Sequence, residues 1–347
     1  MTTTGRPILW LGEDGSRIIQ DHSSDDVMDS AIYYYYDEKG PKIKYKYSRL
    51  FLDNGAYSAN RKGTELDRDK VIELQEAIWP NVTIPLDFPF KTGETINIMQ
   101  KKWAKTVENI VYWQSSTTLV GRLAPALHGW SWDSLRQNAE ALQKNADADM
   151  ICLGSLVNEQ FMERRYYFGD RVPSEEFVLM LYKAIEIVKR STDFKIHIMG
   201  CGSSPLSLHI AYWLGADSVD SSGHRRRAAY GNIILPGTSD RYVGGREGKF
   251  VTRRVNQRER RLLSECNCPA CRRDPQLIWQ NWEARAIHNK YVIKNERDKA
   301  EEWLSQGSDV YEERLESMYR RSGSYHLWRL ARMLVKYPSL RSSGISK

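Results

Sequence analysis

Short apolar runs alternate along the chain with amphipathic stretches or with Gly- and Ser-rich turns. A short apolar run bounded by turn residues is typical of a buried strand. Seven such runs are predicted strands: Ile8–Leu11, Arg49–Asp53, Val82–Asp87, Arg122–His128, Met150–Gly154, Lys195–Gly200 and Asp217–Asp220. Strands that alternate with helices favour a parallel sheet, and about seven or eight such units favour a (β/α)8 barrel over an open sheet. The pattern therefore predicts an α/β fold with a TIM-like barrel.

Two helices are predicted with clear ends. The first follows Ser174, a favoured N-cap residue, and begins with acidic residues that suit the positive end of a helix. Its apolar residues recur at spacings of three and four: Phe177, Met180, Leu181, Ala184, Ile185 and Val188. The second runs from Pro205 to Leu214 and ends at Gly215, a residue type that favours the position after a helix.

A cluster of cysteines predicts a metal site. Cys266, Cys268 and Cys271 lie within six positions, and His288 follows in a helical pattern. Three thiolates and one imidazole fill the tetrahedral shell of Zn²⁺ and leave no open position for water, which is typical of a structural site. The alternative is a chance cluster of buried cysteines with an ordinary histidine. The C-x-C-x2-C spacing favours one structural zinc ion per chain.

The composition of successive segments predicts how the chain divides into domains. Residues 13–48 are polar, and we expect a loop or an added hairpin there. The chain is rich in Gly and Arg over 223–275 and helical in pattern over 276–336. We therefore expect a barrel core over 1–240, a zinc-binding subdomain over 241–295, and C-terminal helices over 296–347 that pack on the barrel.

Composition also excludes some classes of protein. Aromatic residues make up 11% of the chain, which excludes a disordered protein. There is no run of about 18 apolar residues, so no membrane span is predicted. The clustered cysteines and the absence of a signal-peptide pattern predict a reducing, cytoplasmic location. The net charge of +7 favours a polyanionic partner.

Three predicted strands end in an aspartate: Asp53, Asp87 and Asp220. In parallel α/β folds the chemistry takes place at the carboxyl ends of the strands. Two carboxylates there suit glycosidic chemistry, in which one attacks the sugar and the other transfers a proton. The alternative is that each aspartate caps a helix or a turn, which is the commoner use. The basic run Arg225–Arg227 after Asp220 is either a solvated face or a clamp for phosphate groups.

These segments together resemble one family, the tRNA-guanine transglycosylase superfamily, across roughly 49–291. Six segments resemble its motifs in the same order: Leu52–Ser58, Pro85–Pro89, Leu127–Trp130, Leu153–Val157, His197–Ser204 and Gly215–Ser222. The cysteine cluster with His288 resembles the zinc subdomain of the family. The resemblance implies a pentosyltransferase that exchanges a base on a nucleic acid.

The resemblance also implies roles for individual residues. Asp220 would attack C1′ of a guanosine and form a covalent glycosyl-enzyme, and Asp53 would act as general acid and base. Asp87 would bind the guanine edge through N1 and the exocyclic amine. The remaining substrate-binding residues would be Tyr57 and Met199, which sandwich the base, Gly154, Ser155 and Leu156, whose backbone contacts the base carbonyl, and His128 and Gly200.

Several departures from the family pattern indicate a divergent branch. His128 stands where the family has a base-binding Gln, Asn54 and Ser58 replace Ser and Gln, and the His224–Arg227 stretch differs from the bacterial one. These departures favour the branch that replaces guanine in DNA by a 7-deazaguanine of the preQ0 type, in a bacterial cell or a phage-infected host. The alternatives are the same chemistry on tRNA and a non-catalytic nucleic-acid-binding relative.

The resemblance further suggests partners. A free 7-deazaguanine base would be the second substrate, without ATP or a redox cofactor. A homodimer through the zinc region and a helper protein for access to DNA are further candidate partners, and no membrane partner is expected.

Overall fold

The structure is a computed structural model that describes residues 6–13, 21–37, 40–91, 93–156, 174–237, 240–244 and 253–337. The chain forms two compact units. One comprises Met1–Leu9, Arg171–Tyr182 and Gly200–Lys347, and the other comprises Trp10–Asp170 and Lys183–Met199. In the described part of the chain, no helix combines the length and the apolar character that crossing a membrane requires.

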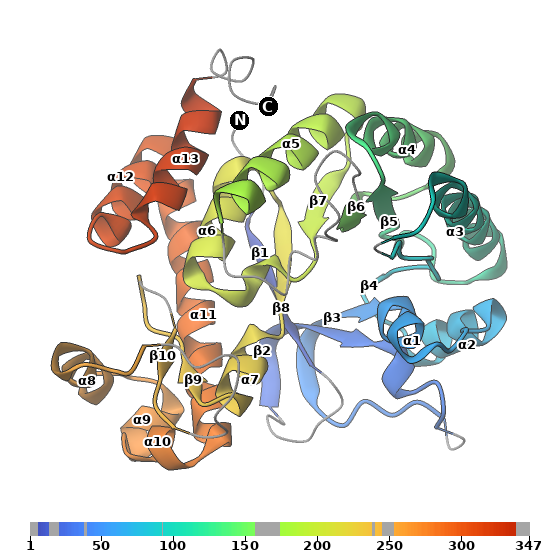
Figure 1. The fold of residues 1–347 in the computed structure, drawn as a ribbon. Helices are drawn as coiled ribbons and strands as arrows, with labels where there is room; N and C mark the ends of the chain where they lie inside the picture. Colours follow the sequence, from blue (N-terminus) through green and yellow to red (C-terminus); the bar gives the residue numbers. More distant parts are fainter. Residues whose placement is uncertain are drawn as a thin grey trace. The chain divides into compact units, whose positions relative to one another are not determined.

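Within the described ranges, eight strands form one sheet, and strands are drawn as arrows in Figure 1. They are β1 (Ile8–Gly12), β2 (Asp21–Ser30), β3 (Lys46–Asp53), β4 (Val82–Thr83), β5 (Ala126–Gly129), β6 (Met150–Leu156), β7 (Lys195–Ile198) and β8 (Ser218–Ser221). Strands β4, β3, β2 and β1 are parallel neighbours in that order, as are β7, β6 and β5. The start of β1 lies beside β8, because Ile8 N donates to Asp217 O (3.1 Å). Thr83 of β4 also forms a parallel bridge with Leu123, just before β5. The predicted α/β, TIM-like fold is confirmed.

Strand β2 corrects the expectation of a loop or hairpin over residues 13–48. It pairs in parallel with β3 over most of its length, from Asp21 beside Lys46 to Ser30 beside Asp53. One core position of this polar strand is filled by a carboxylate. Asp29 is 1% exposed and accepts hydrogen bonds from the hydroxyls of Tyr34 (2.6 Å) and Tyr45 (2.5 Å). The hydroxyls of Tyr34 and Tyr45 thus supply the hydrogen bonds that a buried carboxylate needs, so an acid can fill a position that is usually apolar.

The helices that follow β3 to β6 begin at residues suited to capping. They are α1 (Ala56–Lys62), α2 (Arg68–Ile78), α3 (Ile96–Ser116), α4 (Trp132–Asn145) and α5 (Glu175–Ser191). Asp67 accepts from Lys70 N at the start of α2 (2.8 Å). Ser174 Oγ accepts from Phe177 N (3.2 Å), so the predicted start of α5 is confirmed.

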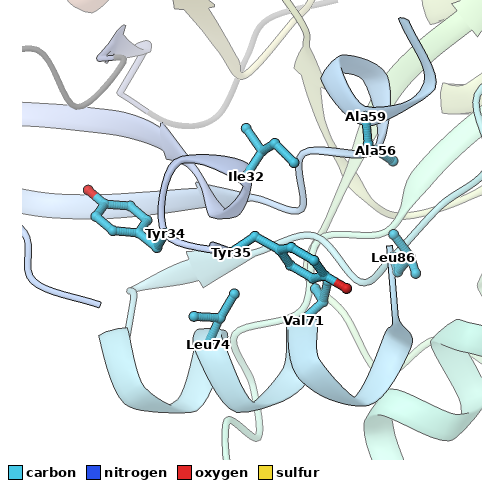
Figure 2. Packing of buried hydrophobic residues seen from close by; sticks show 8 residues of the cluster. All are labelled: Ile32, Tyr34, Tyr35, Ala56, Ala59, Val71, Leu74 and Leu86. Carbon is cyan, nitrogen blue, oxygen red and sulfur yellow. The ribbon is translucent and has the colours of Figure 1, made fainter. Parts of the chain in front are cut away.

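A small apolar cluster positions the polar turn after β3 (Figure 2). It joins the 3-10 helix η1 (Ala31–Tyr33) and its turn to α1, α2 and the segment before Asp87. Gly55 lies against this cluster with a φ of +82°, and a Cβ there would lie 2.7 Å from Ile32 Cβ. Only glycine combines this positive φ with so close an approach. The turn that carries Asp53 and Asn54 is therefore held by packing.

The unit that contains Gly200–Lys347 is mainly helical. Besides β8, its described elements after the 3-10 helix η2 (Cys201–Ser203) are α6 (Pro205–Leu214), α7 (Gly223–Ala229), β9 (Asn232–Ile233), β10 (Arg241–Tyr242), α8 (Gln257–Ser264), α9 (Pro269–Arg273), α10 (Leu277–Gln280), α11 (Trp282–Ser305), α12 (Ser308–Tyr319) and α13 (Tyr325–Lys336). The predicted bounds of α6, with Gly215 after it, are confirmed. Helix α6 is buried along its length, and His209 contacts Glu296 of α11 (3.1 Å) and Tyr311 of α12 (2.8 Å).

Candidate active site and metal centre

Asp53 ends β3, as predicted, and two donors hold its carboxylate. Its Oδ2 accepts from Ser30 Oγ (3.0 Å) and from Gly55 N (3.1 Å). Ser30 reaches it because the two residues are partners in the parallel register of β2 and β3. The half-buried carboxylate therefore has a defined orientation at the end of the strand.

Asp87 lies four residues after β4 and is the centre of a buried polar contact set. Its Oδ1 accepts from Asn54 Nδ2 (2.9 Å), and its Oδ2 is 2.6 Å from His128 Nε2. Because a carboxylate only accepts, His128 carries a hydrogen on Nε2. Asn54 Nδ2 also donates to Pro85 O (2.6 Å), while Asn54 Oδ1 accepts from Ala56 N (2.7 Å). One asparagine thus ties the turn after β3 to the segment after β4.

The other predicted base-binding residues of this unit lie near strand ends. Gly154, Ser155 and Leu156 belong to β6, and Gly154 lies against the His128 ring, since a Cβ on it would be 2.7 Å from His128 Cε1. Tyr57 is in the first turn of α1 with the Arg61 guanidinium 5.8 Å from its ring centroid. Met199 follows β7 and is half-buried. Their contacts with a base stay a prediction.

Asp220 lies in β8, in the unit that begins again at Gly200. Gly200 N donates a short hydrogen bond to Asp220 Oδ1. Burial, with a smaller contribution from the charge of Asp220, raises the pKa of the neighbouring Cys201 thiol. Cys201 therefore stays protonated at neutral pH, and Asp220 is the stronger candidate nucleophile. Asp53 and Asp220 lie in different units, so their cooperation stays a prediction.

The arginine run after Asp220 is mostly engaged within its own unit. Arg225 is 7% exposed. Arg227 Nη1 pairs with Asp240 (2.5 Å), and its Nε donates to Ser203 O (2.8 Å). Arg226 is the exposed member of the three. The proposed phosphate clamp stays a prediction, and this geometry makes Arg226 its most accessible side chain.

Cys266, Cys268, Cys271 and His288 come together as predicted. Their ligand atoms all lie within 4.8 Å of one another, and His288 Nδ1 is 3.5–3.6 Å from each sulfur. A tetrahedral Zn²⁺ with ordinary Zn–S and Zn–N bonds would place sulfur and nitrogen about 3.6 Å apart. His288 Nε2 donates to Ile234 O (3.0 Å), which leaves Nδ1 as the ligand atom. The donor set therefore fits one structural zinc ion.

The helix that carries His288 also holds the segment after Asp220. Asn289 Nδ2 donates to His224 O (3.1 Å) and Asn232 O (3.2 Å), while its Oδ1 accepts from Ile234 N (2.7 Å). Asn289 is fully buried, so these bonds satisfy its amide group. Helix α11 thus connects the metal centre to α7, which follows β8 directly.

Two of these polar residues, Ser30 and Asn54, have no role predicted from the sequence. Ser30 lies in the segment that was expected to be a loop, so its pairing with Asp53 could not be inferred. Asn54 was noted only as a departure from a motif, although its spacing to Ala56 is typical of an Asx turn. Knowledge of the β2–β3 register would have identified Ser30.

The fold and site together define a TIM-like α/β protein with a Cys3His metal centre and aspartates at strand ends. Residues 35–322 match the family described as TGT, queuine tRNA-ribosyltransferase, and the chain belongs to this family. The family assignment agrees with the resemblance inferred from the motifs.

Three relatives have the name tRNA-guanine(15) transglycosylase. The protein of Sulfolobus acidocaldarius is 25% identical over 304 residues, which cover 83% of this chain and 54% of the relative. The protein of Methanosarcina mazei is 23% identical, covering 65% of this chain and 40% of the relative. The protein of Pyrococcus abyssi is 23% identical, covering 74% and 40%. The chain thus spans about half or less of the length of these relatives.

Proposed function

We propose that this protein is a guanine transglycosylase that replaces guanine in a polynucleotide by a free purine-like base. The observation that carries the proposal is the family match over residues 35–322, which includes Asp53, Asp87 and Asp220. Each of these carboxylates is held by hydrogen bonds at or near the carboxyl end of a strand. Such preorganised carboxylates are what base exchange through a covalent intermediate requires.

The chemistry consists of two displacements. In the first, the Asp220 carboxylate attacks C1′, the N-glycosidic bond breaks, and Asp53 gives its proton to the leaving guanine. In the second, the incoming base attacks C1′ and releases the Asp220 carboxylate, and Asp53 takes back a proton from that base. Two inversions retain the configuration of the sugar. The metal ion supports the fold and takes no part in these steps.

The polynucleotide that we propose is tRNA, because the three relatives are all named for tRNA. The departures from the family motifs favour DNA as the alternative substrate, but no relative named above supports DNA. A 7-deazaguanine as the incoming base rests on the resemblance alone, as does a homodimer.

The decisive experiment uses labelled guanine with tRNA, duplex DNA and single-stranded DNA in parallel. We expect incorporation into tRNA by the wild-type protein and none by Asp220→Asn, together with loss of the denaturation-resistant adduct between protein and nucleic acid. Asp309→Asn, at an exposed aspartate in the first turn of α12, is the matched control and should stay active. Incorporation by Asp220→Asn would refute its role as nucleophile, and incorporation into DNA alone would correct the substrate.

A further inference from the structure

A buried acid in β2 anchors the backbone of Ser30, the residue whose hydroxyl contacts Asp53. Asp29 is 1% exposed, and its Oδ1 accepts from the backbone N of Ser30 (2.8 Å). Its Oδ2 accepts from the hydroxyls of Tyr34 (2.6 Å) and Tyr45 (2.5 Å). The parallel register of β2 and β3 then places Ser30 beside Asp53. Because a carboxylate only accepts, the Ser30 hydroxyl donates to Asp53 Oδ2.

The two oxygens of the Asp53 carboxylate are held differently. Oδ2 accepts from Ser30 Oγ (3.0 Å) and from Gly55 N (3.1 Å). The second donor is also fixed in place, because a Cβ on Gly55 would lie 2.7 Å from Ile32 Cβ. A carboxylate oxygen has about two acceptor positions, so these two donors fill the positions of Oδ2. A proton that Asp53 takes up therefore binds to Oδ1.

We propose that Ser30 is a positioning residue that confines the transferable proton of Asp53 to Oδ1. This inference rests on the proposed function and concerns its proton-transfer step. In the first displacement the O–H bond at Oδ1 breaks as an N–H bond forms on the leaving guanine. In the second displacement an N–H bond of the incoming base breaks and the O–H bond at Oδ1 forms again. Without the Ser30 hydroxyl, Oδ2 loses one of these two donors, and the proton is shared between the two oxygens.

The first experiment observes the carboxylate directly and needs no exchange activity. The full chain, loaded with zinc, contains aspartate with an NMR-active carbon isotope at Cγ, and Asp53→Asn identifies the resonance of Asp53. A hydrogen bond to an ionised carboxylate favours the ionised form, so loss of this bond raises the pKa. Ser30→Ala should therefore raise the pH at which the Asp53 resonance titrates by about one unit. Ser30→Thr, which keeps a hydroxyl, should shift this titration by less than about 0.3 unit.

The second experiment follows the exchange of labelled guanine into tRNA as a function of pH. The first displacement needs the proton on Asp53, so kcat/KM for tRNA falls as the pH rises through the pKa of this group. Ser30→Ala should lower the maximal kcat/KM about tenfold, because the proton faces the leaving base for less of the time. It should also move the fall in kcat/KM to higher pH by about one unit. Ser30→Thr should restore both properties.

Ser115→Ala, at an exposed serine of α3 whose hydroxyl donates to backbone oxygens, is the matched control. It should keep the wild-type titration and the wild-type rate. An unchanged Asp53 titration or an unchanged maximal kcat/KM in Ser30→Ala would overturn the proposal. So would equal changes in Ser30→Ala and Ser30→Thr, which would indicate an effect of packing alone. If the wild-type protein exchanges no guanine but the titration shifts as expected, the proposed function fails while the hydrogen bond from Ser30 still controls the Asp53 proton.

Discussion

The close contact between Gly154 and the His128 ring allows a quantitative test, through the free energy of unfolding, of how tightly the ring is packed. A Cβ on Gly154 would lie 2.7 Å from His128 Cε1 and 2.9 Å from Nδ1. Carbon atoms in ordinary contact are about 3.5–4.0 Å apart, so Gly154→Ala requires a shift of about 0.8 Å or more. The ring has little room to shift, because its Nε2 is 2.6 Å from Asp87 Oδ2 and Phe90 packs beside it.

We expect Gly154→Ala to lower the free energy of unfolding by about 2–4 kcal/mol. Overpacking of a closely packed site contributes about 1–3 kcal/mol, and a weakened buried hydrogen bond adds a comparable amount. His128→Ala should cost about 2–4 kcal/mol as well, because it leaves Asp87 without one of its donors. In the double variant the added methyl group enters the space that the ring has left. The stability loss of the double variant should therefore be close to that of His128→Ala alone, which gives a coupling free energy as large as the cost of Gly154→Ala, about 2–4 kcal/mol.

Urea unfolding of the wild-type protein, the two single variants and the double variant measures this coupling. Gly323→Ala is the matched control, because no atom lies within 4 Å of a Cβ placed there and its φ is not positive. It should change the free energy of unfolding by less than about 0.5 kcal/mol. If the losses of the two single variants simply add in the double variant, Gly154 and His128 do not contact each other, and the argument for the confined ring fails.

Two further predictions concern the unit that carries the metal centre. Cys268→Ser removes one of four ligands and should reduce bound zinc, measured by elemental analysis, to well below one ion per chain. Cys152→Ser, at a buried cysteine outside the cluster, should retain the metal, and full occupancy in Cys268→Ser would contradict the ligand set. The second prediction is a pH dependence. Burial alone would raise the pKa of Glu296, but the hydrogen bond and charge of His209, together with Lys299, lower it below 4.5. The stabilisation of the folded protein by the ionised Glu296 carboxylate is therefore complete above pH 4.5, and it is lost as the pH falls through the lowered pKa of Glu296. Glu296→Gln should cost about 3–5 kcal/mol at neutral pH and less in acid, as followed by urea unfolding, and a pH-independent difference would exclude this origin.

Local signals predicted the elements whose causes are local in sequence. Helix α6 was placed correctly because Ser204 and Pro205 begin it and Gly215 ends it. The metal ligands were found for the same reason, since three of them lie within one turn and the adjoining α9. The apolar strands also follow from short hydrophobic runs, but two predicted bounds are wrong: β4 ends at Thr83 instead of Asp87, and β5 begins at Ala126 instead of Arg122.

Strand β2 could not be predicted in this way, because its stabilisation depends on distant residues. Burial raises the pKa of Asp29, and the hydrogen bonds from the hydroxyls of Tyr34 and Tyr45 and from the Ser30 amide oppose this rise in pKa. A periodicity of apolar residues does not record a core position that is filled by an acid and two tyrosines. Because β2 is missing from the predicted strands, the sequence also does not indicate that Ser30 is the partner of Asp53.

The contact between Asp87 and His128 shows why the position of a residue can be predicted while its role is not. The motifs placed Asp87 and His128 at strand ends, and the resemblance suggested that each binds the base. The structure connects them, with 2.6 Å between His128 Nε2 and Asp87 Oδ2, so His128 has a partner within the protein. Such a contact depends on the spacing of β4 and β5 and on a bare Cα at Gly154, and neither can be derived from one sequence.

Within one unit, a short series of hydrogen bonds runs from the metal centre to α7, the helix that follows the candidate nucleophile. His288 is held by Ile234 O, and the next residue, Asn289, bonds to Ile234 N and to the backbone of His224 and Asn232. His224 belongs to α7, which starts three residues after Asp220. A closed Cys3His site has no open position for chemistry, yet it fixes the helix from which these bonds are made. We therefore expect a bound metal ion to stabilise the backbone segment after Asp220 rather than to act on the substrate.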